Sequence, residues 1–372
     1  MIRNPYLQLA EVPAAPGEPL RFHQGLPEYR PTPLHALPQV AADLGLAQVL
    51  LKDESSRLGL TSFKALGASW AIERALREWP RTKTLLAASA GNHGLAVARA
   101  AAARGIDCRI YLPAAAAPAR AERIAATGAR LVRVAGDYDA AVAAAEACAG
   151  ADSVLIADVS ADPDARTPRW VVDGYSTLFA ELASQLAGPV DLVLVPAGVG
   201  SLAAAAVRWA AHQDVSPDVI AVEPDTAACV AAALTAGHPV RVPTPGTTMS
   251  GLDCGTASAA AWPILRAGLT GAVQVSDAQV HRAMRDLADW GLAIGDCGAA
   301  PLAALRELTG LRELTGLREL TGLRELTGLR RLAGLGAGGC VLLVATEGVT
   351  DPDSYRAAVS PRDREPCADQ QE

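Results

Sequence analysis

The sequence lacks three patterns that would place it in a large class of proteins. It has no excess of basic residues, since its 372 residues carry a formal net charge of −7, and we expect neither a nucleic acid nor an anionic membrane as a partner. Its seven cysteines lack CxxC spacing, which argues against a disulfide framework or a zinc site. It has neither a signal-peptide core nor a run of about 18 apolar residues. We expect a soluble cytoplasmic protein without a metal site.

Hydrophobic residues make up 50% of the chain, enough for a sizeable core, and the length suggests two domains. Short apolar segments alternate with alanine-rich helical segments, as in TLLAAS followed by LAVARAAAARG and in DLVLVPA followed by SLAAAAVRWAAH. This alternation predicts an α/β protein with mainly parallel sheets.

Residues 305–334 form a repeat that reads LRELTG four times and then LRRLAG. Leucine recurs every third residue, so successive leucines on a helix would step backward by about 60° and form no single apolar face. Leucine-rich solenoids need periods of about 20 residues or more. We interpret the tract as a tandem expansion within a helix or its following loop, with binding of a partner as the alternative.

The stretch LTSFKALGAS places a lysine near the start of a predicted helix. It follows QVLLKDESS, which reads as a short apolar strand running into a polar turn. We expect Ser62 to cap the helix and Lys64 to lie in its first turn, where the macrodipole disfavours a cation. Apolar neighbours, Phe63 and Trp70 among them, would desolvate the amine and lower its pKa. Lys64 is therefore a candidate Schiff-base nucleophile, with a solvated surface lysine as the alternative.

Two predicted strand–turn–helix units have turns suited to anions. Gly198, Val199, Gly200 and Ser201 form one turn, whose small residues would let backbone N–H groups approach a phosphate closely. This turn has neither the GxGxxG pattern nor a P-loop lysine, and a structural tight turn is the alternative.

The second turn reads SAGNHG and begins at Ser89. Its N–H groups and the Ser89 hydroxyl could hold a carboxylate, and the Asn92 amide could donate to an aromatic oxygen. We interpret His93 as structural rather than catalytic. A desolvated lysine, a phosphate turn and a carboxylate turn together suit a phosphorylated aldehyde cofactor and an amino acid, and pyridoxal 5′-phosphate meets both demands.

Six motifs occur in one order along residues 20–356: FHQGLPEYRPTPLHALP, KDESSRLGLTSFKALGASWA, ASAGNHGLAVA, VPAGVGS, TTMSGLDCG and ATEGVTDP. Together they resemble the diaminopropionate ammonia-lyases, which are fold-type II pyridoxal-phosphate enzymes like the threonine and serine dehydratases. The resemblance implies a tryptophan synthase β-like fold with two open, mainly parallel sheets and a homodimer. It also implies a large domain of residues 1–82 and 166–372, with the repeat as an insertion, and a small domain of residues 83–165.

The resemblance also implies roles for individual residues. Lys64 matches the lysine that binds the cofactor, Asn92 the contact to its phenolic oxygen, and Thr346 the neutral partner of its ring nitrogen. The phosphate would lie on the turn Gly198, Val199, Gly200 and Ser201, and the substrate carboxylate on Ser89, Ala90, Gly91 and Asn92.

The sequence departs from the family pattern at two places. Ala90 replaces the aspartate that serves as base for the D-substrate, whereas Asp158 matches the aspartate that acts on the L-substrate; a strand-end turn residue is the alternative for Asp158. Asp296 and Cys297 replace glutamate and serine. We interpret Cys297 as a small buried residue, with a reactive thiol as the alternative.

The function that the resemblance implies is α,β-elimination of L-2,3-diaminopropionate to pyruvate and ammonia. Asp158 or Lys64 would take the Cα proton, and the Lys64 ammonium would protonate the leaving amine. The alternatives are an L-serine or L-threonine dehydratase, a β-replacement enzyme, and a catalytically inactive binding protein that keeps the fold.

Overall fold

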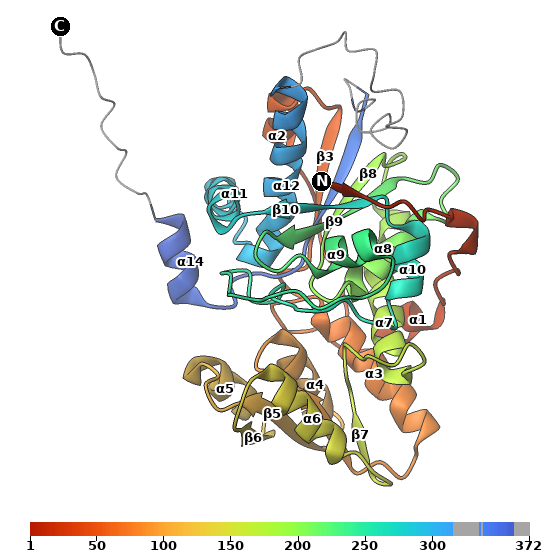
Figure 1. Ribbon diagram of the computed structural model, residues 1–372, viewed down its shortest axis with the longest axis vertical. Helices are drawn as coiled ribbons and strands as arrows, with labels where there is room; N and C mark the ends of the chain where they lie inside the picture. Colours follow the sequence, from red (N-terminus) through yellow and green to blue (C-terminus); the bar gives the residue numbers. More distant parts are fainter. Residues whose placement is uncertain (315–334, 336–337, 361–372) are drawn as a thin grey trace, which may run out of the picture.

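The structure is a computed structural model that describes residues 1–314, 335 and 338–360 (Figure 1). The interpretation of the LRELTG repeat stays a prediction, because residues 315–334 lie outside the described residues. The start of the repeat continues helix α12 (Asp296–Leu314).

The larger of two sheets has seven strands in the order β1-β10-β9-β8-β11-β3-β2. The inner strands run parallel, and the edge strands β1 and β2 run antiparallel to their neighbours. Its strands are β1 (Ile2–Arg3), β2 (Leu34–Ala36), β3 (Gln48–Asp53), β8 (Leu192–Pro196), β9 (Asp218–Pro224), β10 (Gly271–Val275) and β11 (Cys340–Ala345). All residues of β11 are buried, as expected for a strand covered on both faces.

Helices cover both faces of this sheet. Leu342 of β11 pairs with Leu50 and Val193 of the neighbouring strands, and all three pack into one core with α3, α7, α8 and α10. The alternate residues Val341 and Leu343 pack on the other face with α2, α11 and α12. The helices associated with this sheet are η1 (Leu9–Glu11), α1 (Glu18–Gln24), α2 (Pro38–Asp43), α3 (Lys64–Glu78), α7 (Arg166–Glu181), η2 (Leu182–Ser184), α8 (Ser201–Ala210), α9 (Cys229–Ala236), α10 (Trp262–Gly268), α11 (Asp277–Asp289), α12 and α14 (Pro352–Val359).

The smaller sheet lies below the larger one in Figure 1 and is wholly parallel, in the order β6-β5-β4-β7. It consists of β4 (Thr84–Ala88), β5 (Asp107–Pro113), β6 (Arg130–Val134) and β7 (Ser153–Leu155), with α4 (Asn92–Ala102), α5 (Pro118–Ala125) and α6 (Tyr138–Ala147). Two mainly parallel sheets confirm the predicted fold class. The strands fall inside residues 83–165, although the exact domain boundaries stay a prediction.

Helices α3 and α7 approach each other through two glycines. A Cβ atom on Gly174 would lie 2.6 Å from the carbonyl oxygen of Leu66 and 2.8 Å from the Cα of Gly67. A Cβ atom on Gly67 would lie 2.5 Å from the Tyr175 ring. Real Cβ atoms do not come this close to other heavy atoms, so the absence of both side chains sets the position of α3 and of Lys64 at its start.

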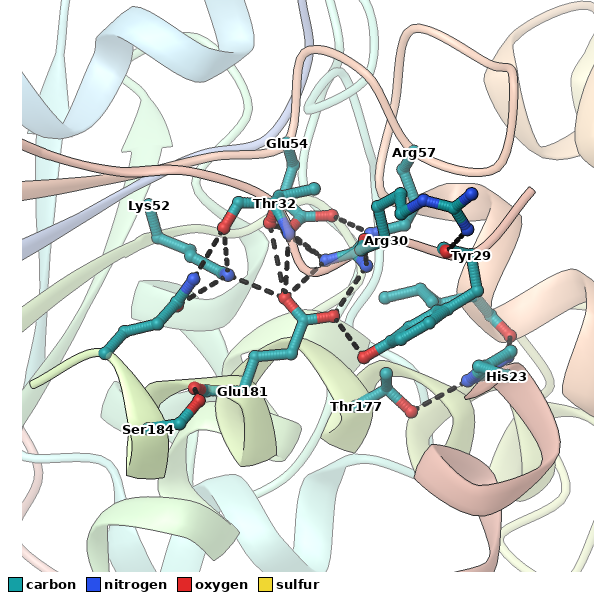
Figure 2. A network of polar contacts seen from close by, with 12 residues as sticks. His23, Tyr29, Arg30, Thr32, Lys52, Glu54, Arg57, Thr177, Glu181 and Ser184 are labelled. Atoms are coloured by element: carbon teal, nitrogen blue, oxygen red, sulfur yellow. Dashed lines mark hydrogen bonds and ion pairs between the residues drawn. The ribbon is translucent and has the colours of Figure 1, made fainter. Parts of the chain in front are cut away.

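A buried network of charged side chains surrounds the chain between β3 and α3 (Figure 2). Lys52 donates to one carboxylate oxygen of Glu181 at 2.6 Å, and Arg57 donates to the other oxygen at 2.6 Å. Arg57 also donates to Glu54 at 2.6 Å, and each of these four side chains is at most 1% exposed. The predicted strand and polar turn are confirmed, since β3 ends at Asp53, but the charged side chains of Lys52 and Glu54 in this segment are buried. Glu181, from α7, supplies partners that the local sequence does not reveal.

Two findings concern the helices and the cysteines of the described residues. None of the helices in the described part of the chain is long and apolar enough to cross a membrane. The six cysteines in that part, Cys108, Cys148, Cys229, Cys254, Cys297 and Cys340, are free thiols.

Candidate active site

A cavity of about 880 Å³ opens where the carboxyl ends of strands from both sheets meet. Its lining includes residues that follow β4, β7, β8 and β11, which is the usual position of ligand sites in parallel sheets. Every residue predicted for the site lines this cavity: Lys64, Ser89, Ala90, Gly91, Asn92, Asp158, Gly198, Val199, Gly200, Ser201 and Thr346. The structure therefore brings all of them together, while the role of each stays a prediction.

Lys64 is the first residue of α3, as predicted, but Ser62 is not the cap. Phe63 occupies that position with helical dihedral angles, and no side chain caps the helix. The Ser62 hydroxyl instead accepts a long hydrogen bond of 3.4 Å from the Lys64 N–H. The main chain of Phe63 donates to the carbonyl of Thr346 at 3.2 Å, which ties the start of α3 to the end of β11.

The Lys64 amine donates to Asp158 Oδ2 at 2.8 Å. Burial lowers the pKa of Lys64, but the charge and the hydrogen bond of Asp158 raise it more, and the pKa lies above its ordinary value. The expectation of a lowered pKa is therefore wrong. The carboxylate that reverses the effect lies 94 residues away along the chain, where no local pattern reveals it.

Asp158 follows the short strand β7 of the smaller sheet and is 14% exposed. Burial works against its ionisation, whereas the charge of Lys64, and that of His93 whenever it is protonated, favour it, and the pKa falls below its ordinary value. Asp158 is thus an ionised carboxylate at neutral pH, which a proton acceptor must be.

The predicted carboxylate loop lies at the start of α4. The Gly91 N–H donates to the Ser89 hydroxyl at 3.2 Å, and α4 begins at Asn92. The Asn92 amide nitrogen donates to Glu347 Oε2 at 2.5 Å. An amide nitrogen carries two hydrogens, so one remains for a ring oxygen. Ala90 lines the cavity without a polar group.

Glu347, which the sequence reasoning missed, lies in a group with Asp296 and Cys297, two positions where the sequence departs from the family pattern. Donor atoms of Glu347, Asp296 and Cys297 lie within 4.8 Å of one another. Burial and the Glu347 charge raise the pKa of Asp296 to about 7, and burial raises that of Glu347. These shifts favour protonated, hydrogen-bonded acids over metal ligands. The sequence could have pointed to Glu347, because it directly follows the predicted site residue Thr346 in the ATEG motif.

Cys297 is 2% exposed, which confirms the interpretation as a small buried residue. Burial and the neighbouring acids raise the pKa of its thiol well above the ordinary value. A thiol that stays protonated is a poor nucleophile, so the structure disfavours the alternative of a reactive cysteine.

The predicted phosphate turn forms a cradle of bare backbone. Gly200 has a φ angle of 90° and precedes α8, whose first N–H groups have no partner within the helix. A Cβ atom on Gly198 would lie 2.9 Å from the Cys254 sulfur and 3.0 Å from the carbonyl of Gly251. Gly198 is therefore required by close packing against residues 251–254, and the first N–H groups of α8 point toward the cavity end of the helix, which suits a phosphate.

Two buried hydroxyls in the cavity wall have no hydrogen-bond partner among the described residues. One is Thr346, which is 3% exposed and whose Oγ1 could bond to a ring nitrogen. The other is Tyr175, which packs on the Phe63 ring at a centroid distance of 4.7 Å and which sequence reasoning missed. Buried polar atoms are rarely unpaired, so these orphans point to a polar ligand. With the phosphate turn and Lys64, the residues fit pyridoxal phosphate.

Comparisons with known proteins agree with this fit. The family model described as pyridoxal-phosphate dependent enzyme matches residues 26–319. Diaminopropionate ammonia-lyase of Salmonella typhimurium is 33% identical, over 92% of this chain and 91% of that protein. The diaminopropionate ammonia-lyase of Escherichia coli is 31% identical, over 91% of this chain and 89% of that protein.

Solved structures give the same result. The crystal structure of Escherichia coli diaminopropionate ammonia-lyase in complex with an aminoacrylate-PLP azomethine reaction intermediate superposes with a TM-score of 0.82. The two sequences are 29% identical, and the superposition covers 96% of this chain and 95% of the Escherichia coli chain. The chain therefore belongs to the diaminopropionate ammonia-lyase family of the fold-type II pyridoxal-phosphate dependent enzymes.

Proposed function

We propose that this chain catalyses the pyridoxal-phosphate-dependent α,β-elimination of L-2,3-diaminopropionate to pyruvate and ammonia. The names of its relatives support the substrate. The observation that carries the proposal is the ion pair between Lys64 Nζ and Asp158 Oδ2, 2.8 Å apart in the cavity wall, because elimination needs both a proton acceptor and a proton donor.

Four elements of the chain would hold the cofactor. Lys64 would bind its aldehyde carbon, the turn at residues 198–201 its phosphate, Asn92 its ring oxygen and Thr346 its ring nitrogen. When bound, the cofactor supplies an electron-withdrawing ring that acidifies the Cα proton of an attached amino acid. A neutral hydroxyl at Thr346 leaves the ring nitrogen unprotonated, which favours elimination over transamination.

The chain's own groups then move the protons. The loop at residues 89–92 holds the substrate carboxylate through its N–H groups and the Ser89 hydroxyl. Asp158 accepts the Cα proton, since it is ionised at neutral pH. Lys64 gives a proton to the β-amine, which leaves as neutral ammonia. Aminoacrylate released into water hydrolyses to pyruvate and a second ammonia.

Ala90 decides the expected stereospecificity. By the family resemblance, this methyl group stands where the family carries the aspartate that acts on the D-substrate. We therefore propose that the enzyme acts on the L-isomer alone, with Asp158 as its base.

The first test is an absorption spectrum of the protein with pyridoxal phosphate, before and after addition of L-2,3-diaminopropionate, together with pyruvate and ammonia assays. We expect a visible band that shifts and then recovers, two ammonia per pyruvate, and no band in Lys64→Ala. A band without any turnover, on this substrate or others, would instead indicate an inactive binding protein.

Parallel assays separate the other candidates. Faster 2-oxo acid formation from L-serine or L-threonine would favour a dehydratase. Incorporation of an added nucleophile in place of pyruvate formation would favour β-replacement. Turnover of D-2,3-diaminopropionate at a similar rate would overturn the role given to Ala90.

We further propose a homodimer in the cytoplasm. The family resemblance supports the dimer, and the free thiols of the described cysteines suit a reducing compartment. Light scattering coupled to size-exclusion chromatography would measure the mass against 38.3 kDa per chain. A single-chain mass at micromolar concentration would overturn the dimer.

A further inference from the structure

His93 places an unused nitrogen beside the proposed base. It lies in the first turn of α4 and is 3% exposed. Its Nε2 lies 2.8 Å from the carbonyl oxygen of Ile156. A carbonyl can only accept, so Nε2 carries the ring proton and the other nitrogen, Nδ1, is an acceptor.

Nδ1 has no hydrogen-bond partner among the described residues, although it is buried. Asp158 Oδ2 lies 3.9 Å from it. Burial lowers the pKa of His93, so the ring is neutral. Two acceptors therefore face each other while Asp158 is ionised, and no hydrogen bond can join them.

Proton transfer to Asp158 would change this relation. The substrate Cα–H bond breaks, an O–H bond forms on the Asp158 carboxyl, and the electron pair stays on the substrate. The carboxyl is now a donor, and Nδ1 is the acceptor that stands beside it. A rearrangement of about 1 Å would bring the two atoms to hydrogen-bond distance.

We propose that His93 is a positioning residue that accepts a hydrogen bond from the Asp158 carboxyl only after that carboxyl has taken the Cα proton. The proposal rests on the proposed function. An interaction that is absent before proton transfer and present after it lowers the barrier without tightening substrate binding. The orphan Nδ1 is thereby explained as an acceptor kept ready for the reaction.

The first test needs no turnover. Asp158→Asn puts an amide donor where the protonated carboxyl would be, and Asp158→Leu has similar size without a donor. In protein labelled with ¹⁵N-histidine, with His93 assigned by its loss in His93→Gln, we expect the Nδ1 resonance to move to the hydrogen-bonded range in Asp158→Asn alone. Equal shifts in both variants, or a protonated His93 in the unaltered protein, would overturn the proposal.

The second test is kinetic and uses the holoenzyme. His93→Gln keeps a donor for the Ile156 carbonyl and an acceptor for Asp158, whereas His93→Leu keeps neither. We expect His93→Leu to lower kcat roughly 10-fold with KM unchanged and to enlarge the isotope effect of Cα-deuterated substrate, and His93→Gln to recover most of the rate. Equal losses without an isotope change would reduce His93 to a structural residue. If the unaltered enzyme does not act on L-2,3-diaminopropionate, the proposed function fails, and the NMR result still decides the hydrogen bond.

Discussion

Two clusters of charged side chains in the described part of the chain, the buried network of Figure 2 and the half-buried pair in the cavity, differ in how completely their hydrogen bonds are made. In the network of Figure 2, Glu181 uses both carboxylate oxygens on Lys52 and Arg57, and Arg57 also binds Glu54. In the cavity, Lys64 and Asp158 pair with each other, but atoms around them stay unpaired, among them His93 Nδ1 and Tyr175 OH.

Charged side chains with a complete set of hydrogen bonds serve the fold, whereas those surrounded by unpaired polar atoms serve ligand binding and catalysis. Folding completes the network, whose members come from β3, α7 and the loop between β3 and α3 and meet only in the folded chain. The cavity is left incomplete, and each orphan costs free energy that a ligand can recover. Removal of a charge should therefore harm stability in the network and function in the cavity.

The largest effect is expected for Glu181→Ala. It leaves Lys52 and Arg57 without their shared carboxylate in a dry site, and we expect a loss of about 3–5 kcal/mol in the free energy of unfolding. Asp164→Ala is the control, because Asp164 is 83% exposed and pairs with an Arg169 side chain that is 52% exposed, and it should cost about 0.5 kcal/mol or less. Urea unfolding measures both, and equal losses would break the comparison.

Asp158→Asn should reverse that pattern. We expect kcat on L-2,3-diaminopropionate to fall by roughly 10²- to 10³-fold, because the base is gone, while the free energy of unfolding at neutral pH falls by less than in Glu181→Ala, because the amide oxygen can still accept from Lys64. Asp152→Asn, in an exposed contact with Lys83, should leave turnover unchanged. Unaltered turnover in Asp158→Asn would refute the assignment of the base.

Asp158 also predicts an acid-side signature. Its folded-state pKa lies below the ordinary value, so its stabilisation is present above the unfolded-state pKa of about 4 and is lost as the pH falls through the folded-state value. The free energy of unfolding of Asp158→Asn should therefore fall less on acidification below about pH 4 than that of the unaltered protein.

Asp296 should give the opposite pH dependence. Its folded-state pKa is raised to about 7, so the native protein holds a proton that the unfolded chain has released above about pH 4. Stability should therefore decrease as the pH rises from 4 to 7, by on the order of 1–2 kcal/mol. Asp296→Asn should flatten this slope in urea unfolding series, and an unchanged slope would mean that Asp296 is ionised in the native state.

The smallest effect sharpens the comparison most. Thr346→Val removes an orphan hydroxyl and should raise the stability of the cofactor-free protein by about 1 kcal/mol while weakening cofactor affinity several-fold. Thr177→Val removes a buried hydroxyl that is bonded to His23 at 2.7 Å, and it should lower stability by about 1 kcal/mol. Thermal unfolding and cofactor titration measure the pair. Losses of stability in both variants would mean that Thr346 has a partner in solution.

The sequence predicted those parts of the site that short segments encode. The turn at residues 198–201 and the place of Lys64 in α3 each follow from a strand, a turn and a helix close together in the chain. The predicted turn SAGNHG is too long, because α4 begins at Asn92, inside it. The raised pKa of Lys64 and the buried state of Arg57 could not be predicted in this way. Each depends on a carboxylate more than 90 residues away, Asp158 or Glu181.

His93 and Glu347 show a second limit. Both stand inside motifs that were recognised, but their significance lies in which atoms are bonded and which are not. His93 matters because its Nδ1 has no hydrogen-bond partner among the described residues. Glu347 matters because it accepts a hydrogen bond from the Asn92 amide. The sequence gives the residue at each position, but it does not show which of that residue's polar atoms are hydrogen-bonded in the folded protein.

The contact of α3 with α7 couples two positions in the evolution of the chain. Because the helices touch at Gly67 and Gly174, an added methyl group at either site would push the start of α3, and with it the Lys64 amine, away from Asp158. The glycine on the facing helix cannot become smaller to make room for that methyl group, because it already lacks a side chain. At Gly67, relief could come only from smaller neighbours in place of Tyr175 and Val171, and Tyr175 itself lines the cavity. At Gly174 the two closest contacts are with main-chain atoms, which no substitution removes. The backbone packing of these helices therefore restricts which substitutions the active site can accept.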